Sequence, residues 1–219
     1  MKRLAAAALL LALAMPARAQ RAPLPSVSIG SGEWHVVLLH GYGAPADDLV
    51  PLARTLSARV AATFDVPGAP MPLPGGGEQW FPIHGDAVDA DVRAACTAVQ
   101  WLIEGSGVSP SHVIVGGFSQ GAMMSIEMAL GPLRLGGIAV LSGRALEHPP
   151  ASYARLSGLP IFASHGRSDP RIPYDRGAAF VTRARENGAD VTFVPFDGGH
   201  AIPPAVEDAL AGWLSAHVR

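Results

Sequence analysis

The sequence predicts an α/β fold with a mostly parallel central sheet, helices on both faces and no large lid. Two observations lead to this prediction. Short apolar runs alternate with helical patterns along the chain, and the runs are apolar at nearly every position. Alternating strands and helices are typical of a parallel sheet, whose strands are buried on both faces. In such sheets the residues that bind ligands follow the carboxyl ends of the strands.

The predicted strands are short stretches of apolar and β-branched residues that stop at glycine, proline or a polar residue. They span residues 34–40, 61–66, a run that begins at His112, and residues 137–141, 159–164 and 190–196. Because most are separated by a helix, we expect them to pair in parallel.

The predicted helices lie between these strands. In the first, apolar residues recur every three or four positions, as on one face of a helix. The predicted helices span residues 47–60, 87–104, the segment after Gly121, and residues 174–187 and 206–218. Residues 67–84, with five prolines and four glycines, and residues 144–158 are expected to be irregular.

Residues 1–19 have the layout of a secretory signal peptide. They contain a basic start at Lys2, an apolar run over 4–14 and an A-x-A cleavage site at 17–19. The apolar run is too short to cross a bilayer, although an uncleaved membrane anchor is the alternative interpretation. We therefore expect an exported protein, periplasmic or secreted, whose residues 20–219 form a single domain.

The charge and cysteine content exclude several classes of protein. Without the three basic residues of the leader, 13 of the 16 basic residues remain against 18 acidic ones, for a net charge near −5. No basic patch stands out, which argues against a nucleic-acid partner. Cys96 is the only cysteine, so the chain has no internal disulfide. Its place on the apolar face of the 87–104 helix indicates a core residue, not a nucleophile or ligand.

The strongest functional signal is the stretch 117–121, Gly-Phe-Ser-Gln-Gly, which fits the pattern G-x-S-x-G. A strand precedes it and helix-forming residues follow it, which is the context of a nucleophile elbow. There the serine projects from a tight turn, and the helix N-terminus favours developing negative charge. An ordinary glycine-rich turn would fit the same residues. We interpret Ser119 as a catalytic nucleophile.

A serine nucleophile needs a base to accept its proton and an acid to orient that base. Asp169 and His200 each follow a predicted strand, and the chain order Ser, Asp, His is one that such hydrolases use. Asp197 is the rival for the acid. Seven other histidines compete for the base, most of them at positions typical of structural or solvated side chains.

The remaining candidates would bind the substrate. The backbone N–H groups of Gln120 and of Tyr42, in the glycine-rich loop after the first strand, are the expected oxyanion donors. That loop would also fit an ordinary turn. Trp80 and Phe81 lie in the proline-rich loop, where large aromatic side chains are costly to leave in water. We expect them to form an apolar wall of the site with Tyr42, although a cap over the core would also explain them.

Together these residues resemble the phospholipase/carboxylesterase family, which includes the acyl-protein thioesterases. The matching segments follow the family order over nearly the whole mature chain: residues 38–43, 79–81, 116–121, 165–169 with 172–173, and 198–202. The resemblance implies an α/β-hydrolase fold and a catalytic triad of Ser119, Asp169 and His200. It also implies hydrolysis of carboxylic esters or thioesters without a metal or other cofactor.

We therefore expect a serine hydrolase of the carboxylesterase/phospholipase type that acts on a small-molecule ester. The irregular stretches leave little chain for a lid, so an open site that prefers short and medium acyl chains is expected. The alternatives are a secreted lipase, polyester depolymerase or peptidase on the same scaffold, or a non-catalytic binding protein. No stable membrane association is expected after the leader is removed, and the sequence does not indicate an oligomeric state.

Overall fold

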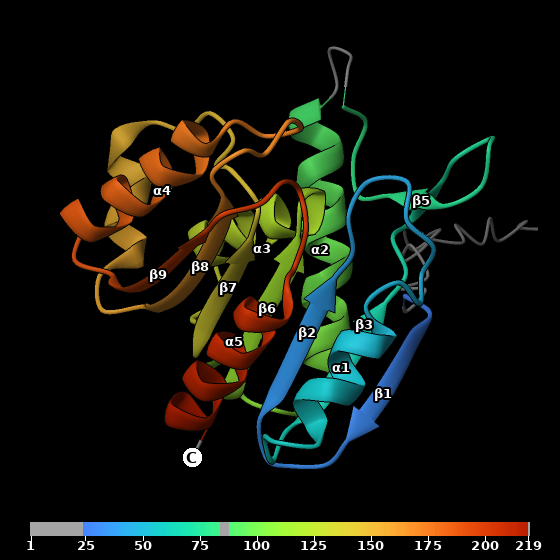
Figure 1. The fold of residues 1–219 in the computed structure, drawn as a ribbon. Coiled ribbons are helices and arrows are strands. Elements are labelled where there is room, and N and C mark those ends of the chain that lie inside the picture. Colours follow the sequence, from blue (N-terminus) through green and yellow to red (C-terminus); the bar gives the residue numbers. More distant parts are fainter. Residues whose placement is uncertain (1–23, 84–87, 219) are drawn as a thin grey trace, which may run out of the picture.

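The structure is a computed structural model that describes residues 24–83 and 88–218 (Figure 1). The predicted signal peptide at residues 1–19 lies outside this part of the chain. So do the end of the 67–84 loop and the first residue of the predicted 87–104 helix. The single-domain boundary at residue 20 therefore stays a prediction.

A seven-stranded sheet with the order β1-β3-β2-β6-β7-β8-β9 forms the centre of the molecule. Only β1 is antiparallel to its neighbour, so the predicted mostly parallel sheet is confirmed. The strands are β1 (Ser26–Gly30), β2 (His35–Leu39), β3 (Thr63–Pro67), β6 (Val113–Phe118), β7 (Gly137–Leu141), β8 (Pro160–Gly166) and β9 (Asp190–Phe196). β1 was missed by the sequence analysis because it is an exposed edge strand with polar residues and no apolar run.

Helices cover both faces of this sheet, as the sequence predicts (Figure 1). They are α1 (Val50–Ser57), α2 (Val88–Gly105), α3 (Gln120–Leu130), α4 (Tyr174–Glu186) and α5 (Pro204–His217), with 3-10 turns η1 (Pro110–His112) and η2 (Pro150–Leu156). α1 and α5 pack on one face, and α2, α3 and α4 on the other. Consecutive residues of β6 alternate between the two cores: Val113 and Val115 face one, Ile114 the other.

Two stretches that we expected to be irregular contain short elements. Residues 67–84 include a small hairpin of β4 (Met71–Pro72) and β5 (Glu78–Gln79), and residues 144–158 include η2. The first helix begins at Val50 rather than at residue 47, with a proline in its first turn. No helix in the described ranges is long and apolar enough to cross a membrane.

Cys96 is half-buried on α2 and packs against the core. Burial, together with nearby Glu127, raises the pKa of its thiol to about 12. A thiol with so high a pKa carries almost no thiolate at neutral pH, which agrees with the interpretation of Cys96 as a core residue.

Candidate active site

Ser119 stands at the sharp turn between β6 and α3, with φ of 55° and ψ of −112°. This is a left-handed φ, which a residue with a side chain rarely adopts. The turn is possible because two glycines remove side chains from crowded positions. A Cβ on Gly117 would overlap the backbone of Gly121, and a Cβ on Gly121 would overlap the carbonyl group of Leu39. The backbone N–H of Ser119 donates to Leu141 O at 2.9 Å, which fixes the turn to β7.

Asp169 and His200 are brought together from two different loops. His200 Nδ1 lies 2.7 Å from Asp169 Oδ2. An ionised carboxylate can only accept, so Nδ1 carries the proton and Nε2 is left free to accept one. The loops are fastened to each other, because the N–H of Ser168 donates to Gly198 O at 3.0 Å. The two side chains therefore have the relation of an orienting acid and a base.

The environment of Asp169 favours its ionised form. Burial of this carboxyl alone would raise its pKa, but hydrogen bonds from His200 and from two backbone N–H groups lower it below its ordinary value. The N–H groups of Arg171 and Ile172 donate to Oδ1 at 2.8 and 2.9 Å. Asp169 is thus held as a carboxylate and in one orientation.

His165 is a second histidine beside Asp169. Its Nε2 lies 2.9 Å from Ile172 O and 3.5 Å from Asp169 Oδ2. The ring is buried, and it occupies the space that a side chain at Gly177 of α4 would fill. His165 therefore packs beneath the loop that carries Asp169. It does not line the Ser119 cavity, whereas His200 does.

Ser119 and His200 line one cavity of about 530 Å³ at the carboxyl edge of the sheet. The elbow residues 118–120 form part of its lining. The His200 ring lies 4.7 Å, centroid to centroid, from the ring of Phe118. Apolar side chains line much of the rest, among them Tyr42, Met123 and Ile172. A small molecule that enters the cavity can reach the hydroxyl of Ser119.

The two predicted oxyanion residues lie at this cavity. Gln120 is the first residue of α3, where backbone N–H groups have no partner inside the helix. Tyr42 lies in the loop after β2 and also lines the cavity. This loop is held by Glu78 of the β4–β5 hairpin, whose backbone exchanges hydrogen bonds with Gly43 and Ala44 at 2.8 and 2.9 Å.

The side chain of Gln120 has a second role that sequence reasoning missed. It is buried, its oxygen accepts from the N–H of Trp80 at 2.9 Å, and its Nε2 donates to Phe81 O at 2.7 Å. Trp80 Nε1 in turn donates to His40 O at 2.9 Å, directly before the Tyr42 loop. The elbow and that loop are thus tied through residues 80 and 81, a link between distant segments that leaves no local pattern.

The structure corrects the prediction for Trp80 and Phe81. Both side chains are buried, at 0% and 3% exposure, and neither lines the Ser119 cavity. They form the cap over the core that was the alternative interpretation. Ile83, which is 52% exposed, lines the cavity instead. An apolar residue at the exposed end of a proline-rich loop was the only sequence signal for it.

The rival candidates lie elsewhere. Asp197 is almost fully exposed and lies 3.4 Å from Arg167 Nε, so it does not orient His200. His40 is buried, with Nδ1 2.8 Å from Gly41 O. His35 pairs with Asp65, and His148 with Glu127. Within residues 24–83 and 88–218, no group of three or more histidine, cysteine or acidic side chains has the geometry to hold a metal ion.

Comparison with known proteins finds relatives among esterases and thioesterases. The family model described as Phospholipase/Carboxylesterase matches residues 31–218. An acyl-protein thioesterase 1 from Eremothecium gossypii is 31% identical and covers 83% of this chain and 87% of its own length. An acyl-protein thioesterase 1 from Emericella nidulans is 28% identical over 86% of this chain and 92% of its own.

The fold is also that of solved esterases. The crystal structure of esterase PE8 superposes with a TM-score of 0.79 at 26% identity, over 90% of this chain and 100% of that one. An acyl-protein thioesterase 2 from Zea mays superposes with a TM-score of 0.73 at 23% identity, over 90% and 100% of the two chains.

Proposed function

The chain belongs to the phospholipase/carboxylesterase family, and from this premise we propose that it cleaves carboxylic esters or thioesters through an acyl-enzyme on Ser119. Membership makes it a hydrolase of the esterase and thioesterase type with an α/β-hydrolase fold. One observation carries the proposal. An elbow serine shares a cavity with a histidine whose Nδ1 lies 2.7 Å from a buried carboxylate.

In the acylation step, Ser119 Oγ attacks the carbonyl carbon of the ester. The hydroxyl proton passes to Nε2 of His200, and Asp169 stabilises the imidazolium that forms. The bond to the leaving oxygen or sulfur then breaks, and His200 returns the proton to that atom. In the second half, His200 takes a proton from water, the hydroxide attacks the acyl carbon, and Ser119 leaves with its proton restored.

The tetrahedral intermediates carry a negative oxygen that needs preorganised donors. The N–H of Gln120, at the positive end of α3, and the N–H of Tyr42 are the proposed pair. The clamp from Gln120 to Trp80 supports both, because it fixes the elbow relative to the segment that contacts His40. The Gln120 side chain is thus a positioning group, and its backbone is the donor.

We assign short and medium acyl chains to this site. Two of the three large apolar side chains that are exposed in the described residues, Tyr42 and Ile83, lie at the cavity. They offer a contact surface that is itself open to water, so a long chain would leave many methylenes uncovered. Each buried CH₂ contributes about 0.8 kcal/mol, and an exposed one contributes little.

Export is a further part of the proposal and rests on residues 1–19 of the sequence. A protein exported by a cleaved signal peptide would begin at Gln20, and intact-mass measurement of exported material tests this. A chain that starts at Met1 in the membrane fraction would instead indicate an anchor.

The test of the catalytic proposal compares hydrolysis of p-nitrophenyl butyrate and of butyryl-thiocholine by wild type and Ser119→Ala. We expect kcat to fall about 10⁴-fold or more for both substrates, as for nucleophile removal in other triads. Ser215→Ala on α5, whose hydroxyl donates to Ala211 O and does not line the Ser119 cavity, is the matched control and should keep wild-type kcat. Activity retained in folded Ser119→Ala would exclude the mechanism. Absence of activity in the wild type, with no fluorophosphonate labelling, would favour a non-catalytic binding protein.

A further inference from the structure

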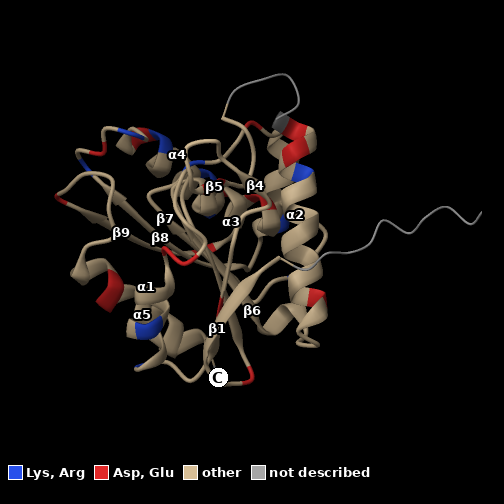
Figure 2. Ribbon diagram, turned by 90° about the vertical axis from the view of Figure 1, so that its right-hand side faces the viewer, with Lys and Arg blue, Asp and Glu red and all other residues tan. Residues whose placement is uncertain are grey.

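A second cavity, of about 360 Å³, lies against α4 and shares no lining residue with the Ser119 cavity. Its wall includes three arginines: Arg144 from the segment after β7, and Arg176 and Arg183 from α4. The two helical arginines are seven residues apart, which places them on the same face of α4. Figure 2 shows both basic and acidic positions on α4, and acidic positions at the start of α2.

None of these three arginines forms an ion pair with a carboxylate in the described ranges. Arg144 Nη1 donates only to the carbonyl of its neighbour Ala145, at 3.1 Å. Arg183 lies over the ring of Tyr153, with Cζ 4.9 Å from the centroid. Other arginines do find acids, as Arg59 does with Asp208. The guanidinium groups at this cavity therefore keep unused donors.

Tyr153 also lines the cavity, and its buried hydroxyl has no hydrogen-bond partner among the described residues. A buried polar group without a partner costs about 1–3 kcal/mol, so such groups are uncommon in native proteins. A ligand with several acceptor atoms in this cavity would bring one of these atoms close to Tyr153. The missing partner of this hydroxyl is a second observation, in addition to the three arginines.

The charge of the cavity indicates the kind of ligand. Among the described residues, Glu147 carries the only carboxylate in the lining, and His148 Nε2 lies 2.7 Å from Glu127 Oε1. Three cations and one carboxylate leave two positive charges. A phosphoryl group carries about −1.5 to −2 near neutral pH and has three strong acceptor oxygens. Guanidinium groups bind such oxygens in a fixed fork geometry.

We propose that this cavity, formed by Arg144, Arg176, Arg183 and Tyr153, is a binding site for a phosphoryl group. The site is separate from the Ser119 cavity, so it does not depend on the proposed catalytic mechanism. A bound phosphoryl group would lie between α4 and the segment after β7. Its negative charge would neutralise the positive charges of the arginines on these two elements.

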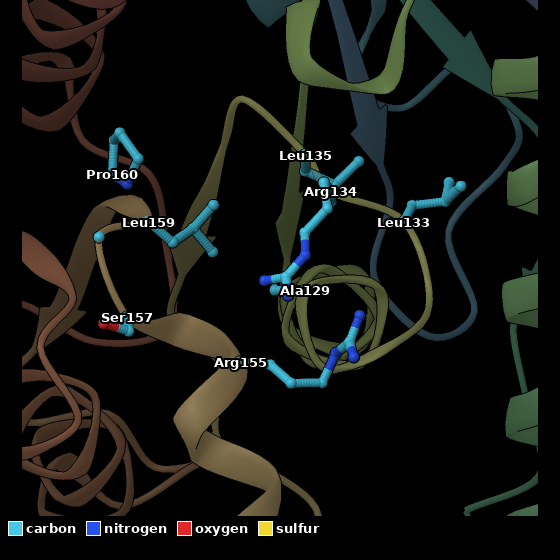
Figure 3. Close-up of a pocket in the computed structure, with 9 residues that line it drawn as sticks. Ala129, Leu133, Arg134, Leu135, Arg155, Ser157, Leu159 and Pro160 are labelled. Atoms are coloured by element: carbon cyan, nitrogen blue, oxygen red, sulfur yellow. The ribbon is translucent and has the colours of Figure 1, made fainter.

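Another arginine-lined cavity, of about 140 Å³, provides the contrast. Figure 3 shows that Arg134 and Arg155 both extend toward the end of α3 that carries Ala129. That end is the helix C-terminus, whose carbonyl groups carry partial negative charge and stabilise cations. Arg155 Nε is buried without a hydrogen-bond partner in the described part of the chain, so only Arg134, which is exposed beside this helix end, serves as the matched control position.

The binding test titrates inorganic phosphate into the full mature chain at constant ionic strength. The arginine Nε–H resonances are followed by NMR, and Arg176 and Arg183 are expected to shift together with one dissociation constant. Arg134 should not shift with that constant, and acetate should bind at least about tenfold more weakly than phosphate. Shifts that are equal at Arg134 and Arg176, or no saturable shift at all, would overturn the proposal.

Substitution gives the second test. Arg176→Gln removes an exposed guanidinium and should weaken phosphate binding by at least about tenfold, the effect of one charge-assisted hydrogen bond. Arg134→Gln removes the same charge from the other cavity and should change the affinity by less than about twofold. Equal losses in the two variants would mean that phosphate senses only the overall charge, which contradicts a built site.

The phosphoryl group could belong to a soluble metabolite or to a lipid. Glycerol 3-phosphate, and phosphatidylcholine vesicles with and without phosphatidic acid, distinguish these sources. Saturable binding of the soluble ester indicates a metabolite site, and binding that occurs only on vesicles with phosphatidic acid indicates a lipid headgroup. In either case Arg176→Gln should abolish most of the binding. If the protein binds neither glycerol 3-phosphate nor the vesicles with phosphatidic acid, the proposal is refuted.

Discussion

The side-chain oxygen of Gln120 accepts a hydrogen bond from the backbone N–H of Trp80 at 2.9 Å. The same side chain donates to Phe81 O at 2.7 Å, so one amide satisfies two backbone groups of a neighbouring loop. Gln120 is also the residue after the elbow serine. Stability of the loop and position of the oxyanion donor are therefore coupled in a single residue.

The first prediction concerns Gln120→Leu. The variant keeps the backbone N–H of residue 120 but leaves two buried backbone groups without partners, at about 1–3 kcal/mol each. We expect urea unfolding to show that the free energy of unfolding is lower by about 2–4 kcal/mol, and we expect kcat to fall as well. Gln100→Leu on the exposed face of α2, where the amide contacts only Glu104, is the control and should change stability by less than about 0.5 kcal/mol. Similar behaviour of the two variants would disprove the clamp.

The second prediction concerns pH and Asp169. Its pKa in the folded protein is below the ordinary value of about 3.9, so its contribution to stability is fully present above that value. The contribution is lost as the pH falls through the lower, folded pKa. The stability advantage of wild type over Asp169→Asn should thus persist down to about pH 4 and be lost below it.

Activity should behave differently from stability over the same range. A histidine base must be neutral to accept the proton of Ser119, so kcat/KM should decrease as the pH is lowered. We expect activity to fall at a pH where urea unfolding still shows the stability advantage of wild type over Asp169→Asn. A stability difference that shrinks together with kcat/KM would show that Asp169 itself titrates there, against the account.

The third prediction compares two glycines inside helices. A Cβ on Gly177 of α4 would overlap the buried ring of His165, whereas a Cβ on Gly212 of α5 meets nothing within 4 Å. Gly177→Ala should destabilise the protein by about 1–3 kcal/mol through overpacking and should lower kcat by moving His165 away from Asp169. Gly212→Ala should stabilise it by about 0.5–1 kcal/mol. Thermal unfolding of both variants tests this, and an unchanged Gly177→Ala would contradict the packing at His165.

Much of the fold could be predicted from the sequence because parallel strands are buried on both faces and are apolar throughout. β6 and β7 have this character, and serine follows each of them. β1 has no such signal, since its exposed edge position demands no apolar residues. The strands with the clearest sequence signal are those whose burial is nearly complete, although β9, which is partly exposed, could also be predicted.

The candidate site could be predicted where chain order alone places residues. Ser119, Asp169 and His200 all follow strands that end at the same edge of the sheet. The positions of Trp80 and Ile83 could not be predicted, because both lie in one proline-rich loop. Which of them turns inward is decided by contacts with distant residues, His40 and Gln120.

The fourth prediction concerns the acyl chain. With Tyr42 and Ile83 exposed at the cavity, butyryl and hexanoyl esters should have a higher kcat/KM than palmitoyl esters. No interfacial activation is expected, and a plot of rate against tributyrin concentration should show no jump at the solubility limit. A jump, or a preference for palmitoyl esters, would reveal a lid or a deep acyl tunnel.

The central claim is that the reaction passes through an acyl-enzyme on Ser119. The most direct measurement is rapid-quench intact-mass analysis during turnover of p-nitrophenyl butyrate, followed by peptide mapping. We expect a mass increase of one butyryl group, located on Ser119 and accompanied by a burst of p-nitrophenol that Ser119→Ala lacks. Turnover without a covalent adduct under conditions where deacylation limits the rate, or an adduct on another residue, would contradict it.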